Sequence, residues 1–266
     1  MLFGVVGKPI GHSLSPAMHN AAFMEKGLNA IYLAFETEDV EGILRGMRAF
    51  NMRGMSVTIP LKSAVIPYLD EVDKIAKKIG AVNTIVNDKG RLKGYNTDAM
   101  GAARALEEKT ELQKKSCLII GAGGAARAIG FILKEKGVKL FVANRSLERG
   151  QGLAHVLECP FIPLKEAGDK RVDLLIQTTP VGMYPNVDQC PVQEDMLHKG
   201  MVVMDIIYNP VETLLLKKAE SKGCVTINGL GMFINQGSEQ FRLWTGMEPP
   251  VSVMSRAVEE ILGRRK

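Results

Sequence analysis

One stretch of the sequence, Lys115–Gly130, limits the possible folds of this chain more than any other. A short apolar run, Cys117–Ile120, is typical of a buried strand and ends at Gly121, where a glycine-rich turn begins. Alanine and other apolar residues then recur at helical spacing over residues 125–136. A strand, a tight glycine turn and a helix are the setting in which G-x-G-x-x-[GA] indicates dinucleotide binding.

The small residues of this fingerprint have separate physical roles. Gly121 permits the turn, Gly123 lets a pyrophosphate approach the backbone, and Ala126 is small enough for the helix to pack on the strand. The first N–H groups of the helix have no partner within it, and its dipole favours an anion there. The pattern therefore predicts a phosphate-binding turn, with a plain strand–helix turn as the alternative.

The next strand indicates which dinucleotide is bound. Lys139–Ala143 is a second buried run, and Asn144–Arg145–Ser146 follows it. NAD enzymes usually place an acid about 20 residues after the first glycine to hold the ribose hydroxyls. This chain has Arg145 there, with Arg149 one helical turn later, and a guanidinium fork matches a phosphate. We predict NADP rather than NAD; the alternative is two solvated charges at a helix start. The missing acid also argues against a methyltransferase.

Length and charge limit the remaining possibilities. The 266 residues predict two domains, since a domain holds roughly 150 residues. Charged residues make up 24% of the chain, which is ordinary for a soluble globular protein. The net charge of +5 includes three cationic residues at the C-terminus (264–266), so we predict no nucleic-acid surface but a preference for anionic small ligands.

Cysteine spacing and hydropathy bear on the compartment. Four scattered cysteines, Cys117, Cys159, Cys190 and Cys224, lack the spacing of a metal site and indicate free thiols in a reducing compartment. No apolar run reaches the roughly 18–20 residues of a membrane span, and the N-terminal residues do not resemble a signal peptide. We expect a cytoplasmic protein with no bound metal and no membrane partner.

Strands and helices alternate before the fingerprint as well, which predicts parallel α/β organisation. Ser15–Pro16 is typical of a helix start, with serine as N-cap and proline in the first turn, and Gly27 is the expected end. The other elements expected before residue 100 are strands at Leu2–Val6, Ala30–Glu36, Met55–Ile59 and Ala81–Val86, and helices at Asp39–Phe50 and about Glu71–Ile79. Later strands are expected at 161–162, 172–176, 202–206 and 225–227, and two helices, 231–245 and 251–262, end the chain.

Polar groups gather where the early strands end. Lys62 follows one strand directly, and Asp98 lies in the first turn of a helix that Thr97 can cap. Further short polar side chains in these positions are Ser13, Ser15, Ser56, Thr58 and Asn83. Carbonyl reduction needs an ammonium that protonates the developing alkoxide and a carboxylate that orients it. Spacing alone favours the alternative of a surface lysine and a cap residue, and His12 is read as a turn residue.

Several motifs together resemble one family, the shikimate dehydrogenases. They are Gly7–Asn20, Ser56–Lys62, Gly80–Thr84, Gly94–Asp98, Gly121–Ala125, Asn144–Ser146 with Arg149, Asp205–Pro210, and Gly229–Met232 with Gln236. The resemblance implies two α/β domains: an N-terminal substrate-binding domain with a mainly parallel sheet (residues 1–100 and about 237–266) and a Rossmann-type NADP-binding domain (101–236). It also implies reversible NADPH-dependent reduction of 3-dehydroshikimate to shikimate, in chorismate and aromatic amino-acid biosynthesis.

The resemblance also implies roles for single residues. Lys62 and Asp98 are the implied catalytic pair, which also contacts substrate. The implied substrate-binding residues are Ser13 and Ser15 for the carboxylate, and Thr58, Asn83, Tyr208 and Gln236 for the carboxylate and ring hydroxyls. The implied cofactor-binding residues are Gly121, Ala122, Gly123, Gly124, Ala125, Asn144, Arg145, Ser146 and Arg149, with Ile206, Gly229 and Met232 near the nicotinamide. Family members are monomers or homodimers.

Two positions depart from the family pattern. Ser56 stands where many members have asparagine, so one substrate contact is expected to be lost or made through water. Gln177–Pro180 replaces the more usual N-A-T-S, which leaves the contacts of this nicotinamide-side loop open. The competing functions are a quinate/shikimate dehydrogenase of broader specificity and a non-catalytic NADP(H)-binding sensor. The sensor is disfavoured because Lys62 and Asp98 are both present.

Overall fold

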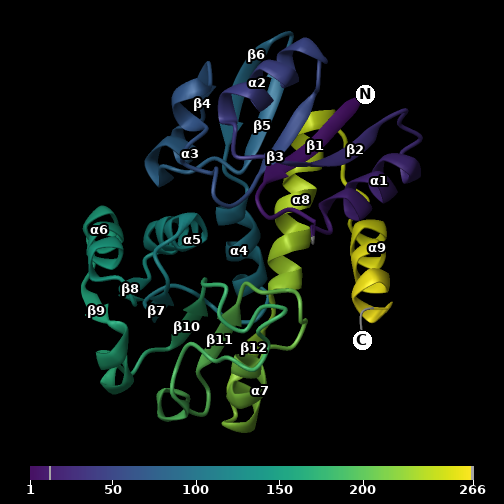
Figure 1. The fold of residues 1–266 in the computed structure, drawn as a ribbon. Coiled ribbons are helices and arrows are strands. Elements are labelled where there is room, and N and C mark those ends of the chain that lie inside the picture. Colours follow the sequence, from purple (N-terminus) through teal and green to yellow (C-terminus); the bar gives the residue numbers. More distant parts are fainter. Residues whose placement is uncertain (12, 265–266) are drawn as a thin grey trace. The chain divides into compact units, whose positions relative to one another are not determined.

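The computed structural model describes residues 1–11 and 13–264, and these form two compact units, each of which we describe by itself (Figure 1). Unit 1 comprises Met1–Thr97 and Ile234–Lys266, and unit 2 comprises Asp98–Phe233. The chain therefore leaves unit 1 once, between Thr97 and Asp98, and returns to it within a helix. His12 lies outside the described residues, so its reading as a turn residue stays a prediction.

Unit 1 is built on a six-stranded sheet in the order β2-β1-β3-β5-β6-β4. Its strands are β1 (Leu2–Gly7), β2 (Ile31–Glu36), β3 (Gly54–Val57), β4 (Glu71–Val72), β5 (Thr84–Asp88) and β6 (Arg91–Tyr95). Only β5 runs against the others, because it pairs antiparallel with both β3 and β6 while the remaining pairs are parallel. The sheet is therefore mainly parallel, as predicted.

The pleat of these strands separates two buried faces. The helices of unit 1 are α1 (Ser15–Glu25), α2 (Val40–Ala49), α3 (Lys74–Ile79), the unit 1 part of α8 (Gly229–Thr245), and α9 (Val251–Arg264). Met55 and Val57 of β3 share a core with α2 and α3. Gly54 and Ser56 point the other way, toward α8, because side chains alternate along a strand. Gly54 has to be glycine, since a Cβ there would collide with the indole of Trp244.

Four local predictions in unit 1 are wrong in detail. The strand expected at Ala81–Val86 is β5, which begins only at Thr84 and continues to Asp88. Ser15 is not the N-cap of α1: the cap position is Leu14, and no side chain among the described residues caps that end. The predicted helix at Glu71–Ile79 begins only at Lys74, because Asp73 caps it and Glu71–Val72 pairs with β6. β3 ends at Val57 rather than Ile59. Gly27 does follow the C-cap of α1, with φ +63°.

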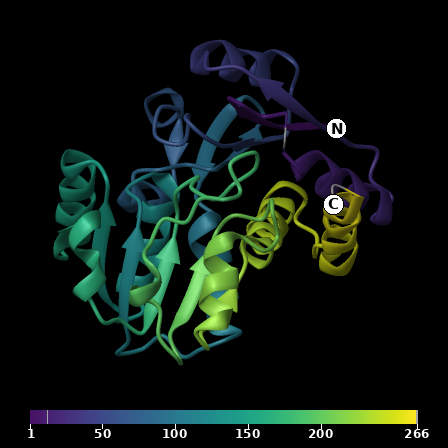
Figure 2. The same cartoon turned by 60° about the horizontal axis from the view of Figure 1, so that its bottom comes forward.

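Unit 2 carries a second six-stranded sheet in the order β12-β11-β10-β7-β8-β9, and every pairing in it is parallel (Figure 2). Its strands are β7 (Ser116–Ile120), β8 (Lys139–Asn144), β9 (Phe161–Pro163), β10 (Leu174–Gln177), β11 (Val202–Asp205) and β12 (Val225–Ile227). Its helices are α4 (Asp98–Glu107), α5 (Gly124–Glu135), α6 (Leu147–Leu157) and α7 (Leu214–Ser221), with the first residues of α8. This strand order is that of the Rossmann fold, as predicted.

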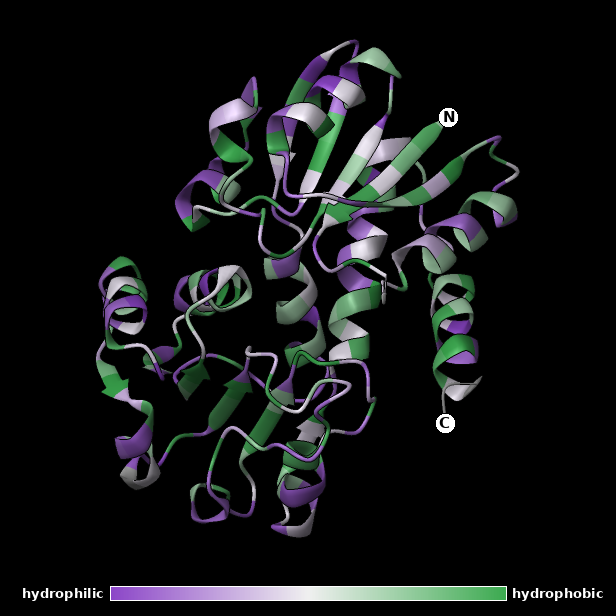
Figure 3. Cartoon of the chain, in the orientation of Figure 1, coloured by the Kyte–Doolittle hydropathy of each residue, from purple (hydrophilic) through white to green (hydrophobic). Residues whose placement is uncertain are grey.

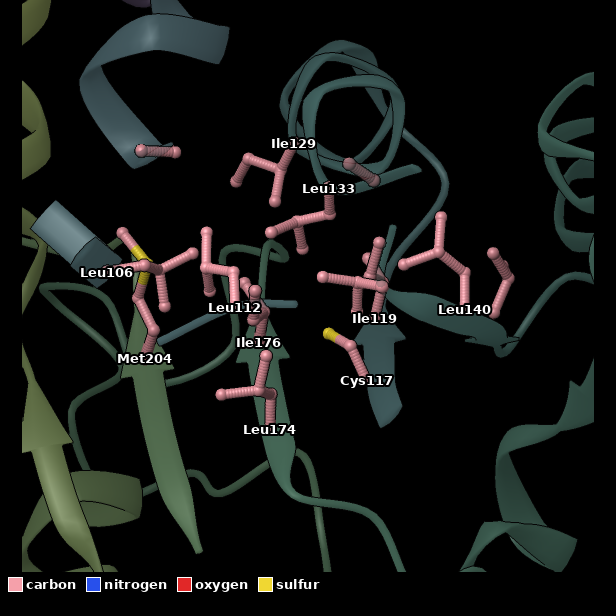
Figure 4. Packing of buried hydrophobic residues seen from close by; sticks show 14 of the residues in the cluster. Leu106, Leu112, Cys117, Ile119, Ile129, Leu133, Leu140, Leu174, Ile176 and Met204 are labelled. Carbon is pink, nitrogen blue, oxygen red and sulfur yellow. The ribbon is translucent and has the colours of Figure 1, made fainter. Parts of the chain in front are cut away.

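Both faces of the unit 2 sheet are covered. The side chains of Ile129 and Leu133 descend from α5 onto Ile119 and Ile176 of β7 and β10 (Figure 4). Hydropathy colours the central strands as hydrophobic over most of their length (Figure 3), as expected for parallel strands buried on both faces. Cys117 lies fully buried in this core, as the sequence predicts. Among the described residues, no helix combines the length and apolar character needed to cross a membrane.

Candidate active site

The glycine turn of unit 2 has the geometry that phosphate binding requires. Gly121 adopts φ +115° and donates its N–H to the Ala143 carbonyl of the neighbouring strand at 2.9 Å. Gly123 is the N-cap of α5, and no side chain among the described residues caps this helix end. A Cβ placed on Gly123 would meet nothing within 4 Å. The first N–H groups of α5 are thus reached through an open glycine surface, which fits a pyrophosphate.

The end of β8 holds the predicted adenosine-side residues beside this turn. Asn144 ends β8, and its amide donates to the Ser146 carbonyl at 3.0 Å. Ser146 caps α6 by accepting the N–H of Arg149 at 3.4 Å. Arg145 and Arg149 are both exposed. Two accessible guanidinium groups at the end of the strand next to the glycine turn fit the extra phosphate of NADP.

The loop after β10 belongs to one of the two departures from the family pattern, and Gln177, the last residue of that strand, holds it in place. Gln177 is fully buried, accepts the N–H of Thr179 at 3.0 Å and donates to the Val181 carbonyl at 3.0 Å. The Thr178 hydroxyl donates to the Ile120 carbonyl at 2.7 Å. The glutamine therefore fastens this loop to the carboxyl end of the sheet.

The later predicted residues of unit 2 cluster after β11. Ile206 donates its N–H to the Gln177 carbonyl at 3.1 Å, and Gly229 donates to the Ile207 carbonyl at 3.0 Å. Met232 is buried, and the ring of Tyr208 stacks on Phe233 at 4.6 Å between centroids.

Asp98 opens α4, as predicted, and is buried.

A buried carboxyl group, for which the sequence predicted no separate role, stabilises the loop that follows β11. Asp205 accepts the Ile207 N–H at 3.0 Å and the Thr213 hydroxyl at 2.8 Å. Burial raises the pKa of Asp205 from 3.8 to about 6, although both hydrogen bonds favour the charged form. Asp205 thereby fixes the backbone that follows β11.

In unit 1, two of the predicted carboxylate-binding residues touch each other. The Ser13 hydroxyl accepts the backbone N–H of Ser15 at 3.3 Å, so Ser13 has a structural role that the sequence did not reveal. Ser15 is buried in the first turn of α1.

The structure also brings Thr58, Lys62 and Asn83 to the end of the unit 1 sheet where β3 finishes and β5 starts. Thr58 follows β3 and donates its N–H to the Val6 carbonyl at 2.9 Å. The backbone carbonyl of Lys62, a partly buried residue, accepts the N–H of Val82 at 2.7 Å. Val82 directly precedes Asn83, so the backbone of Lys62 lies beside that of Asn83. The Asn83 side chain is buried and accepts the N–H of Thr97 at 2.8 Å. Gln236, on α8, is buried as well.

Comparisons with known proteins agree with this arrangement. Three family models match: "Shikimate dehydrogenase substrate binding domain" over residues 5–85, "Shikimate / quinate 5-dehydrogenase" over 103–210, and "Shikimate 5'-dehydrogenase C-terminal domain" over 229–259. A shikimate dehydrogenase (NADP(+)) from Methanothermobacter thermautotrophicus is 45% identical, over 98% of this chain and 96% of that protein. The chain belongs to the shikimate dehydrogenase family.

Solved structures of family members extend the comparison. Shikimate 5-dehydrogenase from Thermus thermophilus, in complex with NADP(H) and shikimate, matches with a TM-score of 0.91 and 39% identity, over 98% of this chain and 99% of that one. Quinate dehydrogenase from Corynebacterium glutamicum, in complex with NAD, matches with a TM-score of 0.91 and 34% identity, over 98% and 99%. The family thus includes both specificities that the sequence left open.

Proposed function

We propose that this chain catalyses the reversible, NADPH-dependent reduction of 3-dehydroshikimate to shikimate, a step toward chorismate and the aromatic amino acids. The observation that carries the proposal is the 45% identity to an NADP-dependent shikimate dehydrogenase over 98% of the chain. The glycine turn before α5 and the exposed pair Arg145 and Arg149 support NADP as the cofactor.

Each predicted residue then has a chemical task. NADPH supplies the hydride when bound. Lys62 donates a proton to the oxygen of the developing alkoxide, and Asp98 orients the lysine and binds a ring hydroxyl. Ser13 and Ser15 donate to the substrate carboxylate. Thr58, Asn83, Tyr208 and Gln236 hold the carboxylate and the remaining hydroxyls.

Cofactor binding is assigned in the same way to the residues of unit 2. The N–H groups of Gly121–Ala125 bind the pyrophosphate. Asn144 and Ser146 hold the adenosine, and Arg145 and Arg149 the extra phosphate. Ile206, Gly229 and Met232 surround the nicotinamide. We further propose that the protein is cytoplasmic, since the four cysteines are free. Its resemblance to the family leads us to propose a monomer or homodimer.

A spectrophotometric assay tests the proposal by following NADP reduction with shikimate. Quinate and NAD are compared under the same conditions, because a relative of known structure is a quinate dehydrogenase. We expect kcat/KM to be highest with shikimate and NADP. Equal values for the two acids would replace the proposal with a quinate/shikimate dehydrogenase of broader specificity, and no turnover with either acid would leave a non-catalytic NADP(H) sensor.

The variant Lys62→Met separates catalysis from binding. A positioned general acid contributes about 10²–10⁴-fold to the rate, so kcat should fall by that factor. The NADP dissociation constant should change less than twofold, since Lys62 has no assigned role in cofactor binding. Retention of kcat in this variant would contradict the role of Lys62.

A further inference from the structure

A chain of side-chain hydrogen bonds crosses the face of the unit 1 sheet that α8 covers, and the mechanism above leaves its central residue, Gln240, without a task. Ser56 and Thr84 lie directly opposite each other on the paired strands β3 and β5. Both side chains reach Gln240: the Ser56 hydroxyl donates to its amide oxygen at 2.8 Å, and its amide nitrogen donates to the Thr84 hydroxyl at 3.0 Å.

Gln240 uses all of its hydrogen-bonding capacity. Its oxygen also accepts from the Nε2 of His19 at 3.3 Å, and its nitrogen also donates to the Asn83 carbonyl at 3.3 Å. The side chain is 1% exposed. The opposite amide orientation would set the glutamine oxygen against the carbonyl oxygen of Asn83, so these partners fix which end of the amide points to each strand.

One end of this series of hydrogen bonds reaches a proposed substrate-binding residue, Asn83, and the other end reaches the buried Tyr32. On one side, the Thr84 hydroxyl donates to the side-chain oxygen of Asn83 at 2.8 Å. On the other side, the Tyr32 hydroxyl donates to Ser56 at 2.6 Å. Gln240 therefore links Asn83 to Tyr32 through buried polar groups.

The same contacts change the expectation for Ser56. We expected its hydroxyl either to lose a substrate contact or to make one through water. Its proton is instead donated to Gln240, and its oxygen accepts from Tyr32. Where many family members have an asparagine amide at position 56, this chain brings an amide to the same face of the sheet from α8.

We propose that Gln240 is a positioning residue of the substrate site, which holds Asn83, both directly and through Thr84, in the orientation that binds the acid. This inference rests on the proposed function, because the assignment of Asn83 does. Gln240 acts through other side chains and has no assigned contact with substrate.

The first test replaces Gln240 by methionine, which has a similar length but no hydrogen-bonding amide. Calorimetric titration with shikimate in the absence of cofactor should show at least tenfold weaker binding, while NADP binding changes less than twofold. Ser238→Ala is the matched control: Ser238 is also buried on α8, but its hydroxyl faces the Met254 sulfur at 3.8 Å. The control should bind shikimate as the wild type does.

The second test moves the amide to the other element. Ser56→Asn alone crowds Gln240, and Gln240→Ala alone leaves the strand residues without their partner, so each should weaken shikimate binding at least tenfold. The double variant Ser56→Asn/Gln240→Ala should recover binding to within about threefold of the wild type. This double variant also tests the proposal if Gln240→Met does not fold.

The outcomes separate the two proposals. Shikimate binding that stays unchanged in folded Gln240→Met, or a double variant that binds no better than its single parents, overturns the role of Gln240 and leaves the proposed function intact. A merely structural role would lower the melting temperature of the Gln240 variants and leave shikimate binding unaltered. A wild-type chain that binds NADP but neither binds nor oxidises shikimate overturns the proposed function together with this inference.

Discussion

His19 should make unit 1 acid-sensitive, and the size of the effect can be worked out from its surroundings. Its ring is fully buried, stacks on Tyr32 at 4.6 Å and lies 5.1 Å from the ring of Trp244. Burial lowers the pKa of His19 from 6.5 to about 3, and the hydrogen bond with Gln240 offsets only part of this. Nδ1 has no hydrogen-bond partner among the described residues. The native state therefore holds a neutral imidazole.

The sign and magnitude follow from proton linkage. Between pH 6.5 and about pH 3 the unfolded chain binds the proton and the native state does not. The free energy of unfolding therefore falls as the pH falls, by about 1.4 kcal/mol per pH unit below 6.5. At pH 4.5 the loss is about 2.7 kcal/mol relative to neutral pH, which is large beside a typical stability of roughly 5–15 kcal/mol.

The assay is urea unfolding at pH 7 and pH 4.5, followed by the fluorescence of Trp244. Trp244 is the single tryptophan of the chain and belongs to unit 1, so its signal reports the unit that contains His19. The variant His19→Phe keeps an aromatic ring in place and removes the titrating group. The wild type should lose about 2.7 kcal/mol more than this variant between the two pH values.

The control is His155→Gln, which removes an exposed histidine of unit 2 and should leave the Trp244 transition as acid-sensitive as in the wild type. Carboxylates that titrate in the same range are common to all three proteins and cancel in the comparison. If wild type and His19→Phe lose the same stability on acidification, then His19 is not held neutral by burial and the reasoning fails.

Two further predictions concern the arginine pair Arg145 and Arg149 and the buried carboxyl group of Asp205. Arg145→Ala and Arg149→Ala should each raise the dissociation constant for NADP about tenfold and leave that for NAD unchanged, because each removes a charged contact to a phosphate that NAD lacks; equal losses for both cofactors, measured by calorimetry, would contradict the assignment. Burial raises the pKa of Asp205 to about 6, so the native state binds more protons than the unfolded chain between pH 3.8 and 6. The free energy of unfolding of unit 2 should therefore fall as the pH rises through that window, by roughly 3 kcal/mol in all. In urea melts followed by far-UV circular dichroism, the wild type should lose roughly 3 kcal/mol more than Asp205→Asn over this window, and an equal pH dependence in the two proteins would refute the assignment.

Local sequence patterns were enough to predict the strand, glycine turn and helix at the start of the proposed cofactor site. The apolar run before Gly121, the glycine spacing and the helix that follows predict a strand–turn–helix unit, and the structure confirms it at Ser116–Glu135. The sequence alone also showed that no acidic residue follows the second strand of this unit, because that observation concerns a single position in the chain. Motif order along the chain was enough to indicate the family, which the comparisons confirm.

Element boundaries were less accessible, because tertiary contacts compete with local preference. Glu71 and Val72 continue a helical pattern but pair with Lys93 and Gly94 of a neighbouring strand. Ser15 has the side chain of an N-cap, yet the chain enters the helix one residue earlier, and Leu14 occupies the cap position.

Only the tertiary structure decided what Ser56 does. By sequence it is a shortened side chain at a site that often holds asparagine, and its partner Gln240 lies 184 residues away. Nothing in the local pattern around Gln240 distinguishes it from any polar residue on an amphipathic helix. The pairing exists because the strand register sets Ser56 opposite Thr84 and packs α8 across both. A hydrogen bond between such distant residues depends on how sheet and helix come together, which no short stretch of sequence encodes.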